Sequence, residues 1–135
     1  NNSWLKCFDE INTGVKKTDW IWYIIPQPFV LQYNTTPKSA YFALADDAEA
    51  VKYLRYSKLS VRLYDIFATI HGIIDTYKKS TADKMFKRDK IKVKSSIDYF
   101  LYILNKYFVK ELTVKPHHLM RALKWILEQL LPHFS

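Results

Sequence analysis

Glycine and cysteine are scarce in this sequence of 135 residues. The two glycines, Gly14 and Gly72, stand far apart, which excludes both a Gly-x-Gly-x-x-Gly turn and a Walker-type phosphate loop. Cys7 is the single cysteine, so an intrachain disulfide and a cysteine-rich zinc site are excluded as well. A lone cysteine is typical of a reducing compartment, and we expect a cytoplasmic, intracellular protein.

Long apolar runs and chelating histidine pairs are also missing. The longest apolar run covers residues 20–26, far short of the roughly 20 residues that a membrane-spanning helix needs. The first residues, Asn-Asn-Ser-Trp, lack a signal-peptide pattern. Adjacent His117 and His118 would point about 100° apart on a helix, and His71 and His133 are isolated. We therefore expect no membrane partner, no metal and no cofactor.

What is present indicates one globular domain over residues 1–135. Hydrophobic residues make up 49% of the chain and charged residues 25%, so the chain is globular rather than disordered. Its length suits a single core, and no linker or repeat interrupts it. Aromatic residues are abundant at 16% and suit either a core or a wet binding surface.

Positive charge is concentrated in one stretch. Of the net charge of +8, the window Lys78–Lys94 contributes +6 through eight basic and two acidic side chains. Such a window could bind the phosphates of a nucleic acid or an acidic protein. The plainer interpretation is a solvated surface, because Lys dominates over Arg and no nucleic-acid-binding motif is present.

Apolar residues recur mostly at helical spacing, which predicts an all-α or mainly α fold. Stripes run over 59–74, 93–108 and 119–130, and a shorter helix is predicted over 3–13 with Gly14 as its end. Helix starts are predicted at Thr36-Pro37, at Asp46 and at Pro116, and a helix end at Pro132. The spacing of the Trp-rich residues 20–25 leaves open whether they are extended or helical.

Four blocks of residues, in order along the chain, carry a resemblance to a known family. Residues 14–27, GVKKTDWIWYIIPQ, resemble the signature G-x-K-x-S-H-W-x-W-[FY]-I-x-P-Q. Shorter blocks at 36–43 and 49–63 resemble S-x-x-A-x-x-Y-A and E-A-x-x-Y-L with L-x-x-R-L. Residues 89–100 resemble D-x-x-K-L-x-S-S-x-x-x-F. These signatures are those of the domain of unknown function 1810 family, bacterial proteins often mislabelled calpastatin.

Two departures from that family bear on chemistry. Asp19 stands where the family has His, which favours binding over catalysis, and residues 28–31 replace a Gly-Leu-Gly loop of the family. In its order of helical blocks the family is also distantly similar to the YbiA-like N-glycosidases. Those enzymes act on ADP-ribose-type or riboflavin-pathway N-glycosides, but the glutamate that marks them has no clear counterpart here.

The resemblance and the polar residues in its blocks predict a pocket for a small nucleotide-like ligand: ADP-ribose, a dinucleotide or a related N-glycoside. We expect phosphate to meet Lys16 and Lys92, a base to stack on Trp20 or Trp22, and hydrogen bonds from Gln27 and Ser95. Asp89 or Asp19 would assist water if the protein hydrolyses N-glycosides. The ligand-binding candidates are Lys16, Trp20, Trp22, Gln27, Arg62, Lys92, Ser95 and Ser96.

Two alternatives stay open. The protein could sequester a signalling nucleotide without turnover, or it could be a basic interaction module that binds nucleic acid or an acidic protein through Lys78–Lys94. Convergence of the candidate residues on one concave site favours a pocket, whereas scattering favours the interaction module.

Overall fold

A computed structural model describes residues 2–14, 16, 24–28, 43–77, 81–114 and 118–135 of the chain. Its helices are α1 (Asn2–Asn12), α4 (Asp47–Arg55), α5 (Ser57–Tyr77), α6 (Thr81–Phe86), the short 3-10 helix η1 (Lys87–Asp89), α7 (Lys90–Tyr107), α8 (Val109–Thr113) and α9 (Leu119–Phe134). Within these ranges, extended pairing is limited to one isolated bridge between Pro28 and Leu44. The predicted mainly α class is confirmed. The predicted helix start at Thr36-Pro37 and the Trp-rich residues 20–23 lie outside the described residues.

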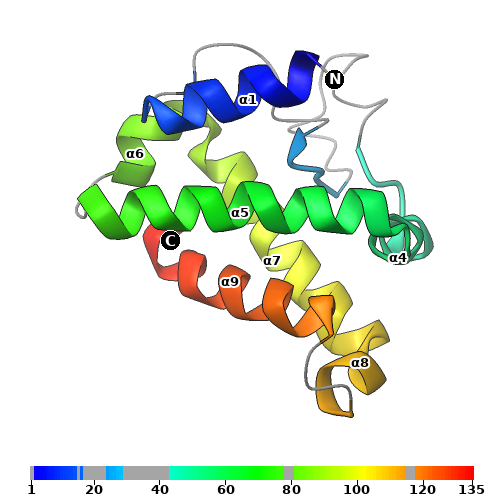
Figure 1. Cartoon of the computed structure of the whole chain (residues 1–135). Coiled ribbons are helices and arrows are strands. Elements are labelled where there is room, and N and C mark those ends of the chain that lie inside the picture. The colour runs from blue at the N-terminus through cyan, green and yellow to red at the C-terminus, as the bar shows by residue number, and fades with distance from the viewer. Residues whose placement is uncertain (1, 15, 17–23, 29–42, 78–80, 115–117) are drawn as a thin grey trace.

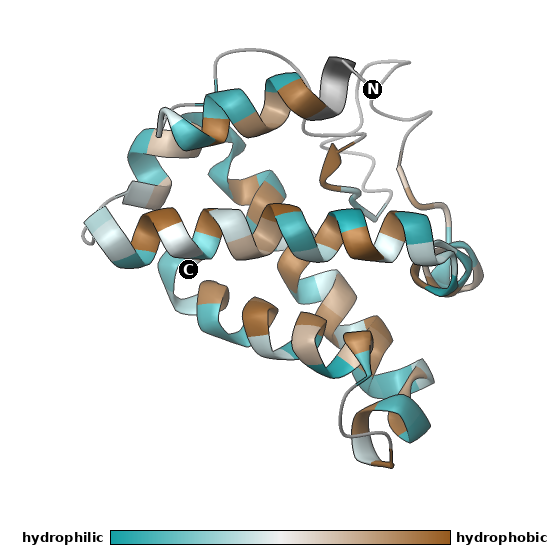
Figure 2. Cartoon of the chain, in the orientation of Figure 1, coloured by the Kyte–Doolittle hydropathy of each residue, from teal (hydrophilic) through white to brown (hydrophobic). Residues whose placement is uncertain are grey.

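The long helices pack on one another through the apolar stripes that the spacing predicted. α9 packs against both α5 and α7, while α1 and α6 lie near one end of α5 and α4 near its other end (Figure 1). Hydrophobic and hydrophilic residues alternate along each long helix (Figure 2), as amphipathic spacing requires. Side chains with no exposed surface form the centre of one core cluster: Phe67, Ile70, Ile97, Phe100, Leu104, Leu123 and Leu127.

Local signals explain most helix ends. The Asp46 carboxylate accepts the Glu49 N–H at 2.9 Å, which caps α4 as predicted. Gly14 has φ 82°, the left-handed conformation that ends a helix. The last helix begins after His118, whose Nδ1 accepts the Met120 N–H at 3.1 Å. Its predicted start, Pro116, lies outside the described residues.

The predicted helix end at Pro132 is wrong, because α9 continues to Phe134. A proline in the last turn removes one backbone hydrogen bond. Phe134, however, is 2% exposed and packs on Phe86 with 5.7 Å between ring centroids. Burial of this ring holds the last turn in place, a contact that sequence spacing does not reveal.

A polar cluster ties α4 to the far end of α7. The hydroxyls of Tyr99, Tyr102 and Tyr107 donate to the Asp47 carboxylate at 2.8–2.9 Å. Three hydrogen bonds to the ionised form lower the pKa of Asp47.

None of the helices in the described part of the chain is long and apolar enough to cross a membrane.

Candidate functional site

Three of the candidate residues form a continuous ion-pair cluster, which we call the Asp89 cluster. Lys16 Nζ lies 2.8 Å from Asp89 Oδ2, and Lys92 Nζ lies 3.2 Å from Asp89 Oδ1. The side chains of Lys16 and Asp89 are 6% and 14% exposed, and that of Lys92 is 26% exposed. One carboxylate therefore holds two ammonium groups, of which Lys92 is the one nearer to solvent.

The turn between α6 and α7 sets the direction of Asp89. Lys87 has φ 51°, a conformation uncommon for any residue other than glycine. Lys87 and Arg88 are exposed, whereas Asp89, the last residue of η1, is largely buried and meets Lys92 one turn into α7. The Lys16 N–H donates to the Met85 carbonyl at 2.7 Å, which anchors the segment after α1 to α6.

The charges around Asp89 decide its protonation. Burial by itself raises the pKa of the Asp89 carboxyl, but the hydrogen bonds and positive charges of Lys16 and Lys92 outweigh it and hold that pKa below its usual range. Asp89 is therefore ionised at neutral pH, with both oxygens engaged by cations. Such a carboxylate suits the positioning of lysines better than it suits proton transfer.

The N-terminal family block and the block at 89–100 meet in space. The Ser96 hydroxyl donates to the Pro26 carbonyl at 2.6 Å across 70 residues of sequence, and Ser96 has no exposed surface. The Gln27 carbonyl accepts the Leu44 N–H at 2.7 Å on the other side. Residues 26–28 are thus fixed between α7 and the chain that leads into α4.

Gln27 holds a buried amide that the fold leaves unpaired. Gln27 as a whole is 8% exposed, and its Nε2 has no hydrogen-bond partner among the described residues. A buried donor without a partner destabilises a protein by about 1–3 kcal/mol. Since Ser96 contacts Pro26 and lies one helical turn beyond Lys92, Gln27 is within roughly two turns of the Asp89 cluster.

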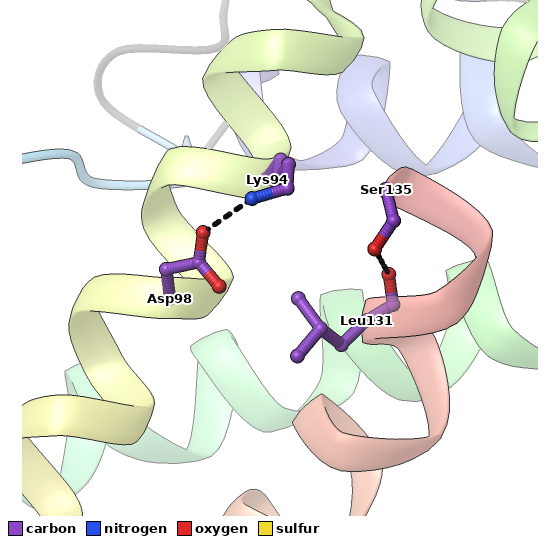
Figure 3. A network of polar contacts seen from close by, with 4 residues as sticks. All are labelled: Lys94, Asp98, Leu131 and Ser135. Carbon is purple, nitrogen blue, oxygen red and sulfur yellow. Dashed lines mark hydrogen bonds and ion pairs between the residues drawn. The ribbon is translucent and has the colours of Figure 1, made fainter.

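Ser95 faces a different space from its neighbour Ser96. It lines a groove of about 500 Å³ beside α7, together with Pro28, Ile91, Lys94, Asp98 and Tyr99. Lys94 pairs with Asp98 at 2.8 Å in this groove (Figure 3). Pro28, the last residue of the 26–28 segment, lines the same groove. Ser95 is therefore the predicted site residue whose side chain faces this open space next to that segment.

Arg62 stands on α5, whereas the Asp89 cluster involves the segment after α1 and the start of α7. Burial raises the pKa of the Tyr53 hydroxyl and the positive charge of Arg62 opposes that shift, which places Arg62 near Tyr53. The Tyr53 ring packs on Phe100 with 6.0 Å between centroids. Asp19, Trp20 and Trp22 lie outside the described residues, and their predicted roles stay predictions.

Two buried side chains of α1 lie within electrostatic range of one another and were not predicted as site residues. Cys7 has no exposed surface and Glu10 is 7% exposed. Burial raises the pKa of the Cys7 thiol, the charge of Glu10 raises it further, and that of Lys16 opposes the shift. Cys7 is therefore an unreactive core thiol. Glu10 stands three residues after Cys7 and therefore on the same face of the helix, and this spacing is the sequence signal that could have pointed to Glu10.

The basic window is partly neutralised by its own surroundings. Lys90 pairs with Asp83 at 2.7 Å, Lys92 with Asp89 and Lys94 with Asp98. The exposed cations in the described part of the window are Lys84, Lys87 and Arg88. In the same described residues, no group of three or more His, Cys, Asp or Glu side chains could hold a metal ion.

Residues 1–115 match the family model whose description is "Protein of unknown function (DUF1810)". No curated protein and no solved structure matches the chain. The matched range includes the Gln27 segment and the whole Asp89 cluster, while α9 follows it. The chain belongs to the DUF1810 family of proteins of unknown function.

Proposed function

We propose that this protein binds a small, anionic, nucleotide-like ligand where residues 26–28 cross α7. ADP-ribose, a dinucleotide or a related N-glycoside would have the required chemistry. The observation that carries the proposal is the buried Gln27 amide nitrogen, which has no partner among the described residues. The contact of Ser96 with Pro26 brings Gln27 to within roughly two helical turns of a cluster with two lysines. Buried polar groups are normally paired, and an exception calls for an explanation such as a ligand.

Each residue of the site has a defined part in this proposal. Gln27 Nε2 donates to a carbonyl or ring nitrogen of the base, and the Ser95 hydroxyl donates to the ligand from the groove. Lys92 supplies positive charge to the phosphates, because it is the more exposed lysine of the Asp89 cluster. Lys16 and Asp89 position Lys92 rather than contact the ligand.

The pairing of Asp89 favours binding without turnover. An acid or base for N-glycoside hydrolysis must exchange a proton with water or with the leaving group. Asp89 is held ionised by two lysines, so sequestration of a nucleotide fits the site better than hydrolysis. Similarity to the YbiA-like N-glycosidases stays a prediction, and release of free base from a bound N-glycoside would support it.

Binding of nucleic acid through Lys78–Lys94 ranks second. Three lysines of this window are paired with carboxylates, which reduces the charge that phosphates would meet. Lys84, Lys87 and Arg88 are the exposed cations that would carry such an interface.

A thermal-shift series tests the proposal. ADP-ribose, NAD, cyclic and linear dinucleotides and flavin precursors are the probes, with adenosine as an uncharged comparison and DNA and RNA polymers as the alternative. A ligand at 100 times its Kd stabilises the fold by about 2.7 kcal/mol. No shift with any small probe, together with polymer binding that falls steeply with salt, would contradict the pocket.

Substitutions separate a binding role from a structural one. Gln27→Met keeps the side-chain length and removes an unpaired buried amide, so the free protein should not lose stability while ligand affinity falls about tenfold. Lys92→Gln should lower the affinity for phosphorylated probes about tenfold and leave any affinity for adenosine unchanged. Lys90→Gln, a change in the lysine that pairs with Asp83, is the matched control and should bind as the parent protein does.

A further inference from the structure

A second cavity lies at the opposite end of α7 from the Asp89 cluster. It has a volume of about 440 Å³, within the usual range for small-molecule sites. Its lining residues come from the end of α4, the start of α5, the junction of α7 and α8 at Phe108, and the start of α9. Figure 1 shows the end of α7 beside α8. Asp89 precedes α7 and Phe108 follows it. About 27 Å of helix therefore separates the two sites.

Arg55 provides the charged group of this cavity. Its guanidinium carbon lies 4.6 Å from the centre of the Phe108 ring, which fixes the plane of the guanidinium over an apolar wall. Its Nη1 makes one long contact, 3.6 Å, with Glu111 Oε1. A guanidinium has five N–H donors in a rigid fork, so this contact leaves the fork with capacity to bind an acid group from the cavity.

His118 provides a donor of known direction. Its Nδ1 accepts the Met120 N–H at 3.1 Å, as the cap of α9. In the neutral ring the proton must then be on Nε2, which can donate to a ligand. Ser57 adds a hydroxyl to the polar side of the cavity, and Leu54 and Met120 join Phe108 on the apolar side.

The local charge selects the kind of anion. Hydrogen bonding to its own backbone lowers the pKa of Glu111, burial opposes that effect, and Arg55 lowers the pKa further. Glu111 is thus ionised at neutral pH and cancels the charge of Arg55. Net charge therefore does not attract an anion to this cavity, and recognition depends on the planar fork of the guanidinium, which a planar carboxylate matches through two parallel hydrogen bonds.

We infer that this cavity binds small carboxylates with an apolar body, with the acid group on Arg55 and His118 Nε2 and the body against Leu54, Leu119 and Met120. The site is separate from the proposed nucleotide site. It uses residues from four helix ends that only the fold brings together.

Benzoate, benzamide and inorganic phosphate are suitable probes in an NMR titration of the full chain labelled with nitrogen-15. Benzoate should shift the amide signals of Leu54, Ser60, Phe108 and Met120. Benzamide, which has the same ring without the charge, should bind about tenfold more weakly, and phosphate should not compete with benzoate. Equal affinity for benzoate and benzamide, or benzoate shifts that avoid these amides, would overturn the inference.

Matched variants assign the contacts. Arg55→Gln should lower the affinity for benzoate about tenfold. His118→Asn should weaken it by a smaller factor while an Asn oxygen still caps α9. Lys58→Gln, an exposed neighbour of Ser57, should stay within about twofold of the parent protein. Unchanged affinity in Arg55→Gln would overturn the inference, and Lys92→Gln should bind benzoate normally whether or not the nucleotide proposal holds.

Discussion

Ser95 and Ser96 are neighbours on α7 with opposite surroundings. Ser96 has no exposed surface and donates to the Pro26 carbonyl, whereas Ser95 lines an open groove. Ser96→Ala should lower the free energy of unfolding by about 1–3 kcal/mol, because it leaves a buried carbonyl unpaired. Ser95→Ala should change it by less than about 0.5 kcal/mol. Urea denaturation measures both, and equal losses would mean that the 26–28 segment is not held by Ser96.

Asp89 gives the stability of the protein a defined pH dependence. Its pKa in the folded state lies below the ordinary value of about 4. The ionised carboxylate therefore stabilises the fold at higher pH, and this contribution disappears as the pH falls through the folded-state pKa. Asp89→Asn should be destabilising at pH 7 by about 3 kcal/mol, since it leaves the largely buried Lys16 without that carboxylate.

The difference between Asp89→Asn and the parent protein should shrink as the pH is lowered below about 4. Unfolding free energies measured from pH 7 to pH 3 test this expectation. Asp98→Asn removes an exposed partner of Lys94 and should change stability little at any pH. A difference between Asp89→Asn and the parent protein that does not vary with pH would show that Asp89 is not held ionised by its lysines.

At the scale of the element, one face of α7 packs in the core and another contacts the N-terminal segment. Val93, Ile97, Phe100 and Leu104 have no exposed surface and pack in the core. Lys92 and Ser96, four residues apart and thus on one helical face, meet the N-terminal segment through the Asp89 cluster and Pro26. The block at 89–100 therefore combines core positions with site positions, and periodicity alone identifies only the former.

The stripes of α5 and α7 should carry much of the stability. Phe67 on α5 and Leu104 on α7 have no exposed surface. Phe67→Ala should reduce the free energy of unfolding by about 3–5 kcal/mol and Leu104→Ala by about 2–5 kcal/mol, through lost burial and a residual cavity. Val61→Ala, at an exposed position of α5, should cost less than about 1 kcal/mol. Chemical denaturation would contradict the assigned core if all three variants lost similar stability.

At the scale of the whole molecule, one core cluster contains residues of α1, α4, α5, α6, α7 and α9. Elements that share one core unfold together. Thermal unfolding should therefore follow a single transition, with the far-ultraviolet circular dichroism of the helices and the near-ultraviolet signal of the aromatic residues changing at the same temperature. Two separated transitions would contradict the prediction of a single domain over 1–135.

The sequence by itself determined the helical class, the long stripes, the cap at Asp46 and the family. These features are local: helical periodicity and capping involve residues within a few positions of one another. The end of α9 was predicted wrongly because the contact of Phe134 with Phe86 is not local.

Only the tertiary structure decided which polar residues meet. Lys16 and Asp89 pair across more than half of the chain, and Ser96 reaches Pro26 across 70 residues. Arg55 and His118 belong to none of the motifs seen in the sequence, yet they line one cavity. The physical reason is the same in each case: a charge or donor acquires its role from neighbours, burial and local electrostatics, and chain spacing does not encode these once residues come from different helices.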